Sequence, residues 1–350
     1  MPRALITGIT GQDGVLLAEN LLERGYEVVG FGRRPSILAR TDLHRLYKRI
    51  KVVYGDAADS VDLTDALLNY QPDELYNLAA LSAPGASWAQ SLETGEVTAM
   101  GAHRLFEAAR RFGPKCRVYH ASSSEMFGAV LESPQNEATP FNPANPYAVA
   151  KVYAHQMAHV YRNSYGLFIS CGILFNHESP LRRMNFLTQK VSYGAACAKL
   201  GIRDSNLLNE EGEPVVRGGK LALGNLDAAR DWGHARDYVE AMRRMLQQAA
   251  PDDYVIGTGK LRTVRELCDA AYQYVGHDWR EHVTVDPRFL RPSETGPTVA
   301  DASKAKRELG WEPIIGFDAM VAEMVDAQLA VLNGGPSHGA WRREQIASQN

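Results

Sequence analysis

Residue types that can do acid–base chemistry gather in two short runs of this sequence. The run from Ser122 to Gly128 carries Ser123 and Glu125, and Tyr147 and Lys151 follow in a Tyr-x-x-x-Lys pattern. Residues four apart lie on one face of a helix. A lysine beside a phenol favours the phenolate, so we expect the tyrosine to act as a base near neutral pH. Glu125 adds a second acid or base, which a dehydratase needs and a simple oxidoreductase does not.

Tyr-x-x-x-Lys alone is common in ordinary helices, so its interpretation depends on what precedes it. A short apolar strand, residues 4–7, leads directly into Gly8, Gly11 and Gly14, and residues 15–24 then have helical apolar spacing. Glycines let the backbone approach a diphosphate, and the following helix start offers unpaired N–H groups. The spacing is Gly-x-x-Gly-x-x-Gly rather than Gly-x-Gly-x-x-Gly. Its place between a strand and a helix predicts a dinucleotide site.

The end of the second predicted strand bears on the choice of cofactor. Residues 27–31 are followed by Gly32, Arg33 and Arg34. Sites selective for NAD usually carry an acidic residue near this point, whereas arginine suits the 2′-phosphate of NADP. We therefore expect NADP, with Arg33 as a contact. The alternative is that both arginines are solvated surface residues.

Strand-like and helical segments continue to alternate, which predicts an α/β fold with a Rossmann-like, doubly wound parallel sheet. The further predicted elements are strands at 51–54, 74–78, 117–121 and 167–175 and a helix at 94–112. Asp56 follows one strand as a possible partner for adenine, and Ala79 and Ala80 are small enough to let a cofactor lie close. The strand at 117–121 delivers Ser123 and Glu125 at its carboxyl end, the edge where such sheets bind ligands.

The second half of the chain is less regular and predicts a smaller C-terminal substrate domain. A polar, Gly-rich stretch at 203–220 has the composition of an excursion or hairpin, and helices are expected at 237–248, 263–275 and 317–332. We expect a Rossmann NADP-binding domain over 1–178, to which a later segment of about 221–260 also belongs. A discontinuous, mainly substrate-binding domain is expected over 179–335, and a tail over 336–350.

Composition excludes several classes of function. The 350 residues are 45% hydrophobic and 23% charged with a formal net charge of −3, which is ordinary for a globular protein and gives no nucleic-acid footprint. No apolar run is long enough to span a membrane, and the start lacks the features of a signal peptide, so we expect a cytoplasmic protein without membrane partners. The four cysteines are scattered, which predicts reduced, buried thiols. No metal-ligand spacing is apparent, and no metal is expected.

Several longer runs, in order along the chain, resemble the extended short-chain dehydrogenase/reductase superfamily, and more closely the GDP-mannose 4,6-dehydratases. The resemblance covers about residues 3–332. Its most specific pieces are residues 8–14 (GITGQDG), 172–180 (GILFNHESP), 223–227 (LGNLD), 230–234 (RDWGH), 291–294 (RPSE) and 309–313 (LGWEP).

The resemblance implies roles for residues at matching positions. The catalytic group is Ser123, Glu125, Tyr147 and Lys151. The NADP contacts are Gly8, Ile9, Thr10, Gly11, Gln12, Asp13, Asp56, Ala57, Leu78, Ala79, Ala80, Leu81, Ser82, His177 and Arg182, together with Tyr147 and Lys151. The substrate contacts are Ser87, Asn176, Glu178, Lys190, Arg230, Arg291 and Glu294. The implied partner is GDP-mannose or a related GDP-sugar, and the implied assembly is a homodimer or homotetramer.

Three positions depart from the family pattern, which usually has threonine at Ser123, tyrosine at Phe127 and arginine at Gln189. Residues 81–88 are smaller and less polar than in the family, and the excursion at 203–220 is longer. A bulkier GDP-manno-heptose is therefore an alternative substrate. A related 4-epimerase or 4-keto-sugar reductase is a further alternative, although neither needs Glu125. A dinucleotide-binding regulator without catalysis should lack the tyrosine or the lysine, and this chain has both.

Overall fold

The computed structural model describes residues 1–34, 36, 43–209, 211–290 and 296–334. The predicted substrate contacts Arg291 and Glu294 lie outside these residues, as does the predicted tail over 336–350.

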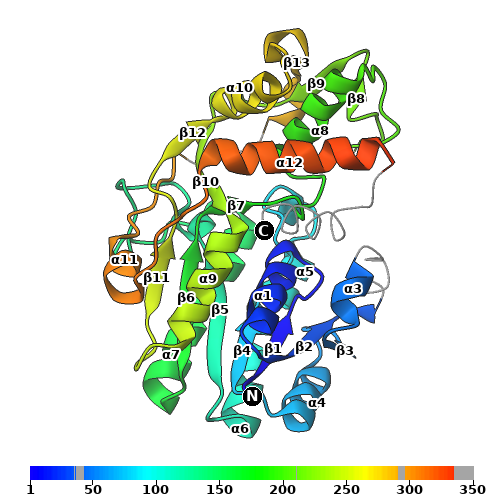
Figure 1. Cartoon of the computed structure of the whole chain (residues 1–350). Helices are drawn as coiled ribbons and strands as arrows, with labels where there is room; N and C mark the ends of the chain where they lie inside the picture. Colours follow the sequence, from blue (N-terminus) through cyan, green and yellow to red (C-terminus); the bar gives the residue numbers. More distant parts are fainter. Residues whose placement is uncertain (35, 37–42, 210, 291–295, 335–350) are drawn as a thin grey trace.

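A parallel sheet of seven strands forms the larger body of the molecule (Figure 1). Its strand order is β11-β6-β5-β4-β1-β2-β3. The order reverses between β1 and β4, and ligands bind at such a switch point, outside the carboxyl ends of the strands. The strands are β1 (Arg3–Thr7), β2 (Glu27–Gly32), β3 (Lys51–Tyr54), β4 (Glu74–Asn77), β5 (Arg117–Ser123), β6 (Ile169–Leu174) and β11 (Asp253–Ile256).

Helices cover both faces of this sheet, so its inner strands are buried on both sides and read as continuous apolar runs. Neighbouring residues of β1 show the two faces. Ile6 packs with helices α1 (Gln12–Glu23), α9 (Ala235–Leu246) and α11 (Ser303–Leu309). Leu5 packs on the opposite face with α4 (Ser60–Tyr70), α6 (Gly101–Phe112) and α7 (Pro146–Tyr165). Side chains alternate along a strand, so one short strand supplies both cores.

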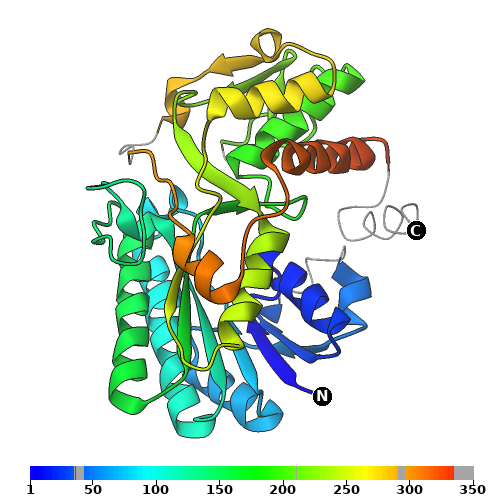
Figure 2. The same cartoon turned by 60° about the vertical axis from the view of Figure 1, so that its left-hand side comes forward.

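A smaller body lies beyond the carboxyl edge of the sheet, at the top of Figures 1 and 2. Its own apolar core joins three helices to a three-stranded sheet of order β13-β9-β8. The elements are α8 (Leu187–Leu200), α10 (Val264–Tyr274), α12 (Phe317–Leu332), β8 (Val216–Arg217), β9 (Lys220–Leu223) and β13 (Val283–Val285). A second small sheet, β12-β10-β7, connects the two bodies; it consists of β7 (Asn176–Glu178), β10 (Ala229–His234) and β12 (Leu261–Thr263).

The predicted fold class is confirmed. The predicted strands and helices are present with bounds shifted by a few residues at most. The helix expected at 94–112 is built from α5 (Ser91–Thr94), a π-helical segment (Gly95–Met100) and α6. The excursion at 203–220 contains the bridge between Leu208 and Pro214 and strand β8. Late in the chain, α9 and β11 join the larger body, whereas β9 belongs to the smaller one; the domain bounds as such stay a proposal.

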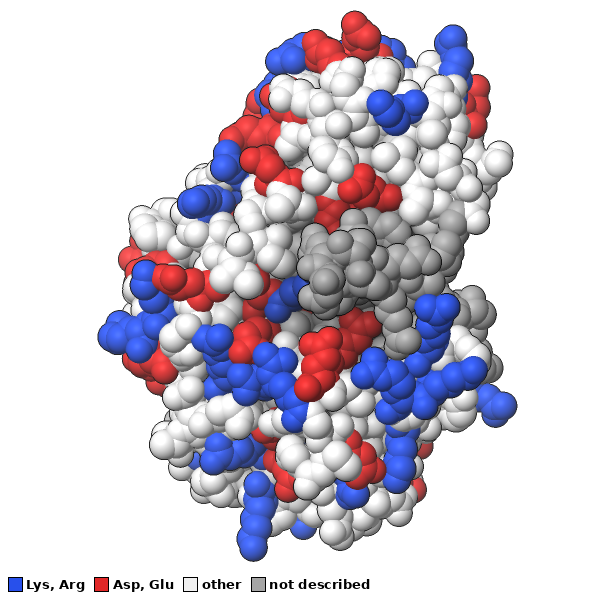
Figure 3. All heavy atoms as spheres, in the orientation of Figure 1, with Lys and Arg blue, Asp and Glu red and all other residues white. Residues whose placement is uncertain are grey.

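The mixed surface charge and the buried cysteines are those of an ordinary globular protein. In the face drawn in Figure 3, acidic and basic side chains are interspersed over both bodies. The four cysteines, Cys116, Cys171, Cys197 and Cys268, are buried and free, as predicted. Among the described residues, no helix combines the length and apolarity that crossing a membrane requires.

Candidate active site

The loop between β1 and α1 is compact because it contains glycines. Gly8 has a φ of +73°, and a Cβ there would lie 2.9 Å from the carbonyl carbon of Leu78. A Cβ on Gly14 would lie 2.5 Å from the Gly8 oxygen. Neither position accepts a side chain, so the loop stays close to the end of β4 and α1 begins at once behind it. The backbone N–H groups of that helix start are available to an anion.

Thr7 ties the ends of the two strands at the switch point together. Its hydroxyl donates to Asn77 Oδ1 (3.0 Å) and accepts from the backbone N–H groups of Leu78 (3.1 Å) and Ala79 (3.2 Å). This contact fixes the floor of a cavity between the glycine loop and the segment after β4.

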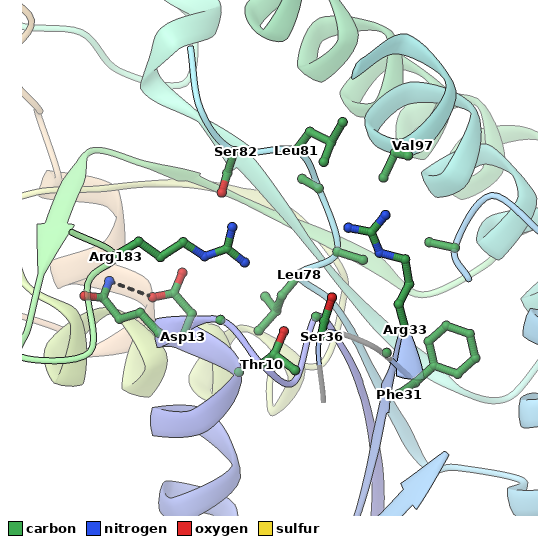
Figure 4. Close-up of a pocket in the computed structure, with 18 of the residues that line it drawn as sticks. Thr10, Asp13, Phe31, Arg33, Ser36, Leu78, Leu81, Ser82, Val97 and Arg183 are labelled. Carbon is green, nitrogen blue, oxygen red and sulfur yellow. Dashed lines mark hydrogen bonds between the residues drawn. The ribbon is translucent and has the colours of Figure 1, made fainter. Parts of the chain in front are cut away.

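That cavity has about 1010 Å³ of empty space, and Figure 4 shows its lining. Arg33 and Ser36 lie at one side, and Arg183 extends into it from the other, near Ser82. The predicted cofactor contacts that line it are Gly8, Thr10, Gly11, Gln12, Asp13, Arg33, Asp56, Ala57, Leu78, Ala79, Ala80, Leu81, Ser82 and Arg182. The side chain of Ile9 is instead buried in the core beneath the loop. The contacts themselves stay predictions.

The start of α1 is connected to β7 by a polar cluster. Gln12 Nε2 donates to the His177 carbonyl (3.0 Å), and the Ser179 hydroxyl donates to Gln12 Oε1 (2.8 Å). His177 Nε2 lies 2.9 Å from Asp13 Oδ2. Burial alone would lower the pKa of His177, but the Asp13 carboxylate raises it on balance. Burial would likewise raise the pKa of Asp13, and His177 lowers it on balance. The two groups therefore form a half-buried ion pair at the border of the cavity.

A larger cavity, with about 2190 Å³ of empty space, adjoins the first and lies between the two bodies. The two cavities share Asp13, Leu78, Ala80, Ser82, Arg182 and Phe186. The predicted residues that line the larger cavity and not the smaller are Ser123, Glu125, Tyr147, Lys151, Asn176, His177, Glu178, Lys190 and Arg230. The structure thus brings the four predicted catalytic residues together beside the smaller cavity.

Two elements position this catalytic group. Ser123 ends β5 and caps a short 3₁₀ helix, Ser124–Phe127, by accepting from the Glu125 N–H (3.2 Å). Tyr147 and Lys151 lie in the first turns of α7, whose cap is Asn145. The Asn145 side chain accepts from the Ala148 N–H (2.8 Å) through Oδ1 and donates from Nδ2 to Glu125 Oε2 (2.9 Å). One amide therefore starts the helix and orients the carboxylate.

The surroundings of the Tyr147 phenol and the Lys151 ammonium differ from those expected of a lysine that stabilises a phenolate. Lys151 Nζ donates to the Ala121 carbonyl (2.7 Å) and lies 5.8 Å from the centroid of the Tyr147 ring. Burial lowers the pKa of Lys151 to about 8. Burial also raises the pKa of Tyr147 above its ordinary value, although a hydrogen bond with Ser123 opposes the shift. In the protein alone, burial therefore outweighs the groups that favour ionisation of Tyr147, and its role as a base stays a prediction.

The predicted substrate contacts fall into different surroundings. Glu178 is 2% exposed; its Oε2 accepts from the Thr188 hydroxyl (2.8 Å) and lies 3.0 Å from Arg182 Nε, so this carboxylate is already engaged. Lys190 Nζ lies 5.7 Å from the centroid of the Phe289 ring at the cavity wall. Arg230 lines the same cavity. Ser87 is buried, donates to the Pro84 carbonyl (2.7 Å) and is not among the lining residues, because that hydrogen bond turns it inward.

Sequence reasoning missed Asn145 and Arg183. Asn145 precedes Pro146 at the start of α7, and Asn before Pro at the first helical position is a capping signal that could have identified it. Arg183 lines the smaller cavity next to the predicted Arg182. The sequence shows two adjacent arginines after a strand, but it is the turn carrying them that brings both to the cavity wall.

The fold and the site together define a Rossmann-like enzyme of the short-chain dehydrogenase/reductase type, with an added carboxylate beside its Ser–Tyr–Lys group. Solved structures agree on the fold. A UDP-glucose 4-epimerase from Thermus thermophilus in complex with NAD superposes with a TM-score of 0.77 at 25% identity, covering 93% of this chain and 98% of that one. A dTDP-glucose 4,6-dehydratase from Bacillus anthracis gives 0.77 at 20% identity, covering 95% and 97%.

Sequence comparisons identify the family. The family model described as GDP-mannose 4,6 dehydratase matches residues 5–324. "GDP-mannose 4,6 dehydratase 1" from Arabidopsis thaliana is 46% identical over 338 residues, which is 93% of this chain and 89% of the relative. The human GDP-mannose 4,6 dehydratase is 41% identical over 361 residues, covering 95% and 93%. The chain belongs to the GDP-mannose 4,6-dehydratase family.

Proposed function

We propose that this protein converts GDP-mannose to GDP-4-keto-6-deoxy-mannose, as a hydro-lyase that ends each cycle with its nicotinamide cofactor in the starting redox state. The observation that carries the proposal is the position of Glu125. Its carboxylate is held by Asn145 in the same cavity as Ser123, Tyr147 and Lys151, beside the smaller cavity that contains the glycine loop. Family membership supports the same substrate.

The residues of the smaller cavity fit a dinucleotide. Gly8 and Gly14 stand where any side chain would collide with backbone, which leaves room for a diphosphate at the start of α1. Arg33 lies in the lining where a 2′-phosphate would sit in NADP, so we infer NADP rather than NAD. When bound, the oxidised nicotinamide accepts hydride from sugar C4 and later returns it to C6, and its positive charge favours ionisation of Tyr147.

Tyr147 and Ser123 handle the proton of the sugar O4 hydroxyl. Ser123 lowers the pKa of the Tyr147 phenol against the effect of burial, so this pair of hydroxyls can take up the O4 proton when C4 is oxidised. Lys151, whose Nζ lies 5.8 Å from the centroid of the Tyr147 ring, supplies a positive charge near the phenol. A positioned proton acceptor of this kind contributes roughly 10²- to 10⁴-fold in rate.

Glu125 carries the dehydration. The C4 ketone acidifies the proton on C5; the carboxylate takes that proton, and the C6 hydroxyl departs with a proton as water. The bound cofactor would then return its hydride to C6 and a proton would return to C5, so the net change is the loss of one water. An epimerase or a 4-keto-sugar reductase needs no group in the place of Glu125, which is why we favour the dehydratase.

A GDP-manno-heptose is a second candidate substrate. Gly85 lines the larger cavity, and a Cβ added there would meet nothing within 4 Å. This small residue leaves space for a sugar that is longer at C6. We also propose that the protein is cytoplasmic and that it assembles as a homodimer or homotetramer. Light scattering on the purified protein tests the assembly.

The deciding experiment is incubation with GDP-mannose, and separately with a GDP-manno-heptose, without added reductant. Mass spectrometry should find a product lighter by one water and no net reduction of cofactor. Arg230 lines the larger cavity and we infer that it contacts the diphosphate of the GDP-sugar, so Arg230→Ala provides the matched binding control. Charge-assisted contacts to phosphate contribute roughly 1.5–3 kcal/mol each, so its apparent GDP-sugar constant should rise tenfold or more while cofactor affinity stays unchanged. A product of unchanged mass would point to an epimerase and contradict the proposal.

A further inference from the structure

Two histidines and an aspartate converge behind the catalytic group. His155 and His159 lie one turn apart on α7, and Asp253 begins β11 beside them. One ligand atom of each, a ring nitrogen or a carboxylate oxygen, lies within 4.8 Å of the other two. No sequence pattern indicated this cluster, because Asp253 comes 94 residues after His159. The expectation of no metal rested on spacing alone.

Both imidazoles face the same carboxylate oxygen. His159 Nε2 lies 2.5 Å from Asp253 Oδ2, and His155 Nε2 lies 3.7 Å from that oxygen. The two ring centroids are 4.6 Å apart. His155 is 2% exposed and His159 is 33% exposed, so the cluster is closed on one side and reachable from solvent on the other.

Neighbouring groups hold these side chains in place. His155 Nδ1 lies 2.8 Å from the Ser122 hydroxyl, and Phe141 packs edge-on against the same ring with centroids 5.2 Å apart. Arg162 Nη2 lies 2.5 Å from Asp253 Oδ1, which leaves Oδ2 to the histidines. A hydrogen bond at the far ring nitrogen and a second partner on the carboxylate are what orient ligands in metal sites.

We propose that His155, His159 and Asp253 bind a divalent first-row transition ion, with Zn²⁺ as the simplest occupant. Zn²⁺ takes nitrogen ligands at about 2.0–2.1 Å and carboxylate oxygen at about 2.0–2.2 Å, and three protein ligands leave a fourth position for water. Neighbouring ligand atoms of such a tetrahedron stand roughly 3.3 Å apart, so the His159–Asp253 contact must open by roughly 0.8 Å. The partly exposed ring of His159 has room for that shift.

The positive charge of Arg162 opposes a cation and limits the affinity. In this arrangement the bound ion would stabilise the fold and take no part in the reaction. It joins α7, which carries Tyr147 and Lys151, to β11, and through Ser122 to the end of β5.

The test uses tag-free, full-length protein stripped with a chelator. We expect one equivalent of Zn²⁺ per chain, a rise in melting temperature on adding Zn²⁺, and a tetrahedral absorption spectrum on adding Co²⁺. His159→Ala should weaken Zn²⁺ binding at least tenfold and remove the Co²⁺ spectrum. His44→Ala, an exposed histidine elsewhere, is the matched control and should change neither.

His155→Ala removes a buried ring and can simply fail to fold, so His159→Ala and Asp253→Asn carry the test. The proposal is overturned if the parent protein binds no Zn²⁺ or Co²⁺. It is equally overturned if binding survives in both variants. Loss of thermal stability in His159→Ala without any metal binding by the parent would identify the cluster as an ion pair only.

Discussion

Replacing Asn145 separates the stability of α7 from the chemistry of the site. This side chain makes two contacts with opposite ends of its amide: Oδ1 caps the helix at Ala148, and Nδ2 donates to Glu125. Asn145→Ala removes both contacts. Asn145→Asp keeps the cap, because Asp and Asn are equivalent there, and replaces the donor with a second carboxylate facing Glu125.

The two contacts have different magnitudes. Loss of a helix cap costs about 1 kcal/mol of stability, within a range of roughly 0.5–2 kcal/mol. A hydrogen bond to a charged group contributes about 1.5–3 kcal/mol. If that bond orients Glu125 in the dehydration step, its loss lowers kcat by roughly 10- to 150-fold. Asn145→Ala should therefore be both less stable and slower.

Asn145→Asp is the decisive variant. Its melting temperature should stay close to that of the parent, while dehydration slows at least as much as in Asn145→Ala, because two adjacent carboxylates disfavour ionisation of both. The rate of water loss, measured against pH, should shift its ascending limb to higher pH. If Asn145→Asp dehydrates GDP-mannose like the parent at every pH, Asn145 does not orient Glu125.

Other substitutions probe the remaining parts of the site. Tyr147→Phe should lower turnover by roughly 10²-fold or more with little change in GDP-sugar affinity; unchanged activity would make Tyr147 an ordinary helix residue. Arg33→Asp should weaken NADP more than NAD in a binding titration, and equal losses would exclude a 2′-phosphate contact. The His177–Asp13 pair should stabilise the fold most between pH 3.8 and pH 6.5, the ordinary pKa values of aspartate and histidine. Below this range Asp13 gains a proton, and above it His177, whose pKa is raised, loses one, so the ion pair is lost at either end. The melting-temperature difference between the parent and His177→Asn should therefore shrink above pH 6.5, and a difference independent of pH would contradict the ion pair.

Local sequence signals were enough for the fold and for most of the cavity lining. The glycines at 8, 11 and 14 act through backbone geometry that belongs to the strand–loop–helix unit itself, so their position followed from the sequence. Parallel strands bring their carboxyl ends to one edge, which is why Ser123 and the residues after β4 could be expected together.

Contacts that depend on tertiary placement were not predictable. The Lys151 ammonium goes to the Ala121 carbonyl, because the strand–helix packing brings that oxygen within 2.7 Å, and no pattern in the Tyr-x-x-x-Lys motif encodes it. Ser87 turns inward to a carbonyl three residues away. Glu178 lines the larger cavity, where its role as a substrate contact stays a prediction, but its pairing with Arg182, which burial of the charge requires, was not visible in the sequence.

Glu125→Gln tests the central claim most directly. The substitution keeps the shape and the contact with Asn145 but removes the base for C5, so oxidation at C4 continues while water loss falls by roughly 10²- to 10⁴-fold. After addition of GDP-mannose, the absorbance of the reduced nicotinamide should rise and persist, with no product lighter by one water. Dehydration at the parent rate, without reduced cofactor accumulating, would contradict the assignment of Glu125 as the base and with it the division of labour in this site.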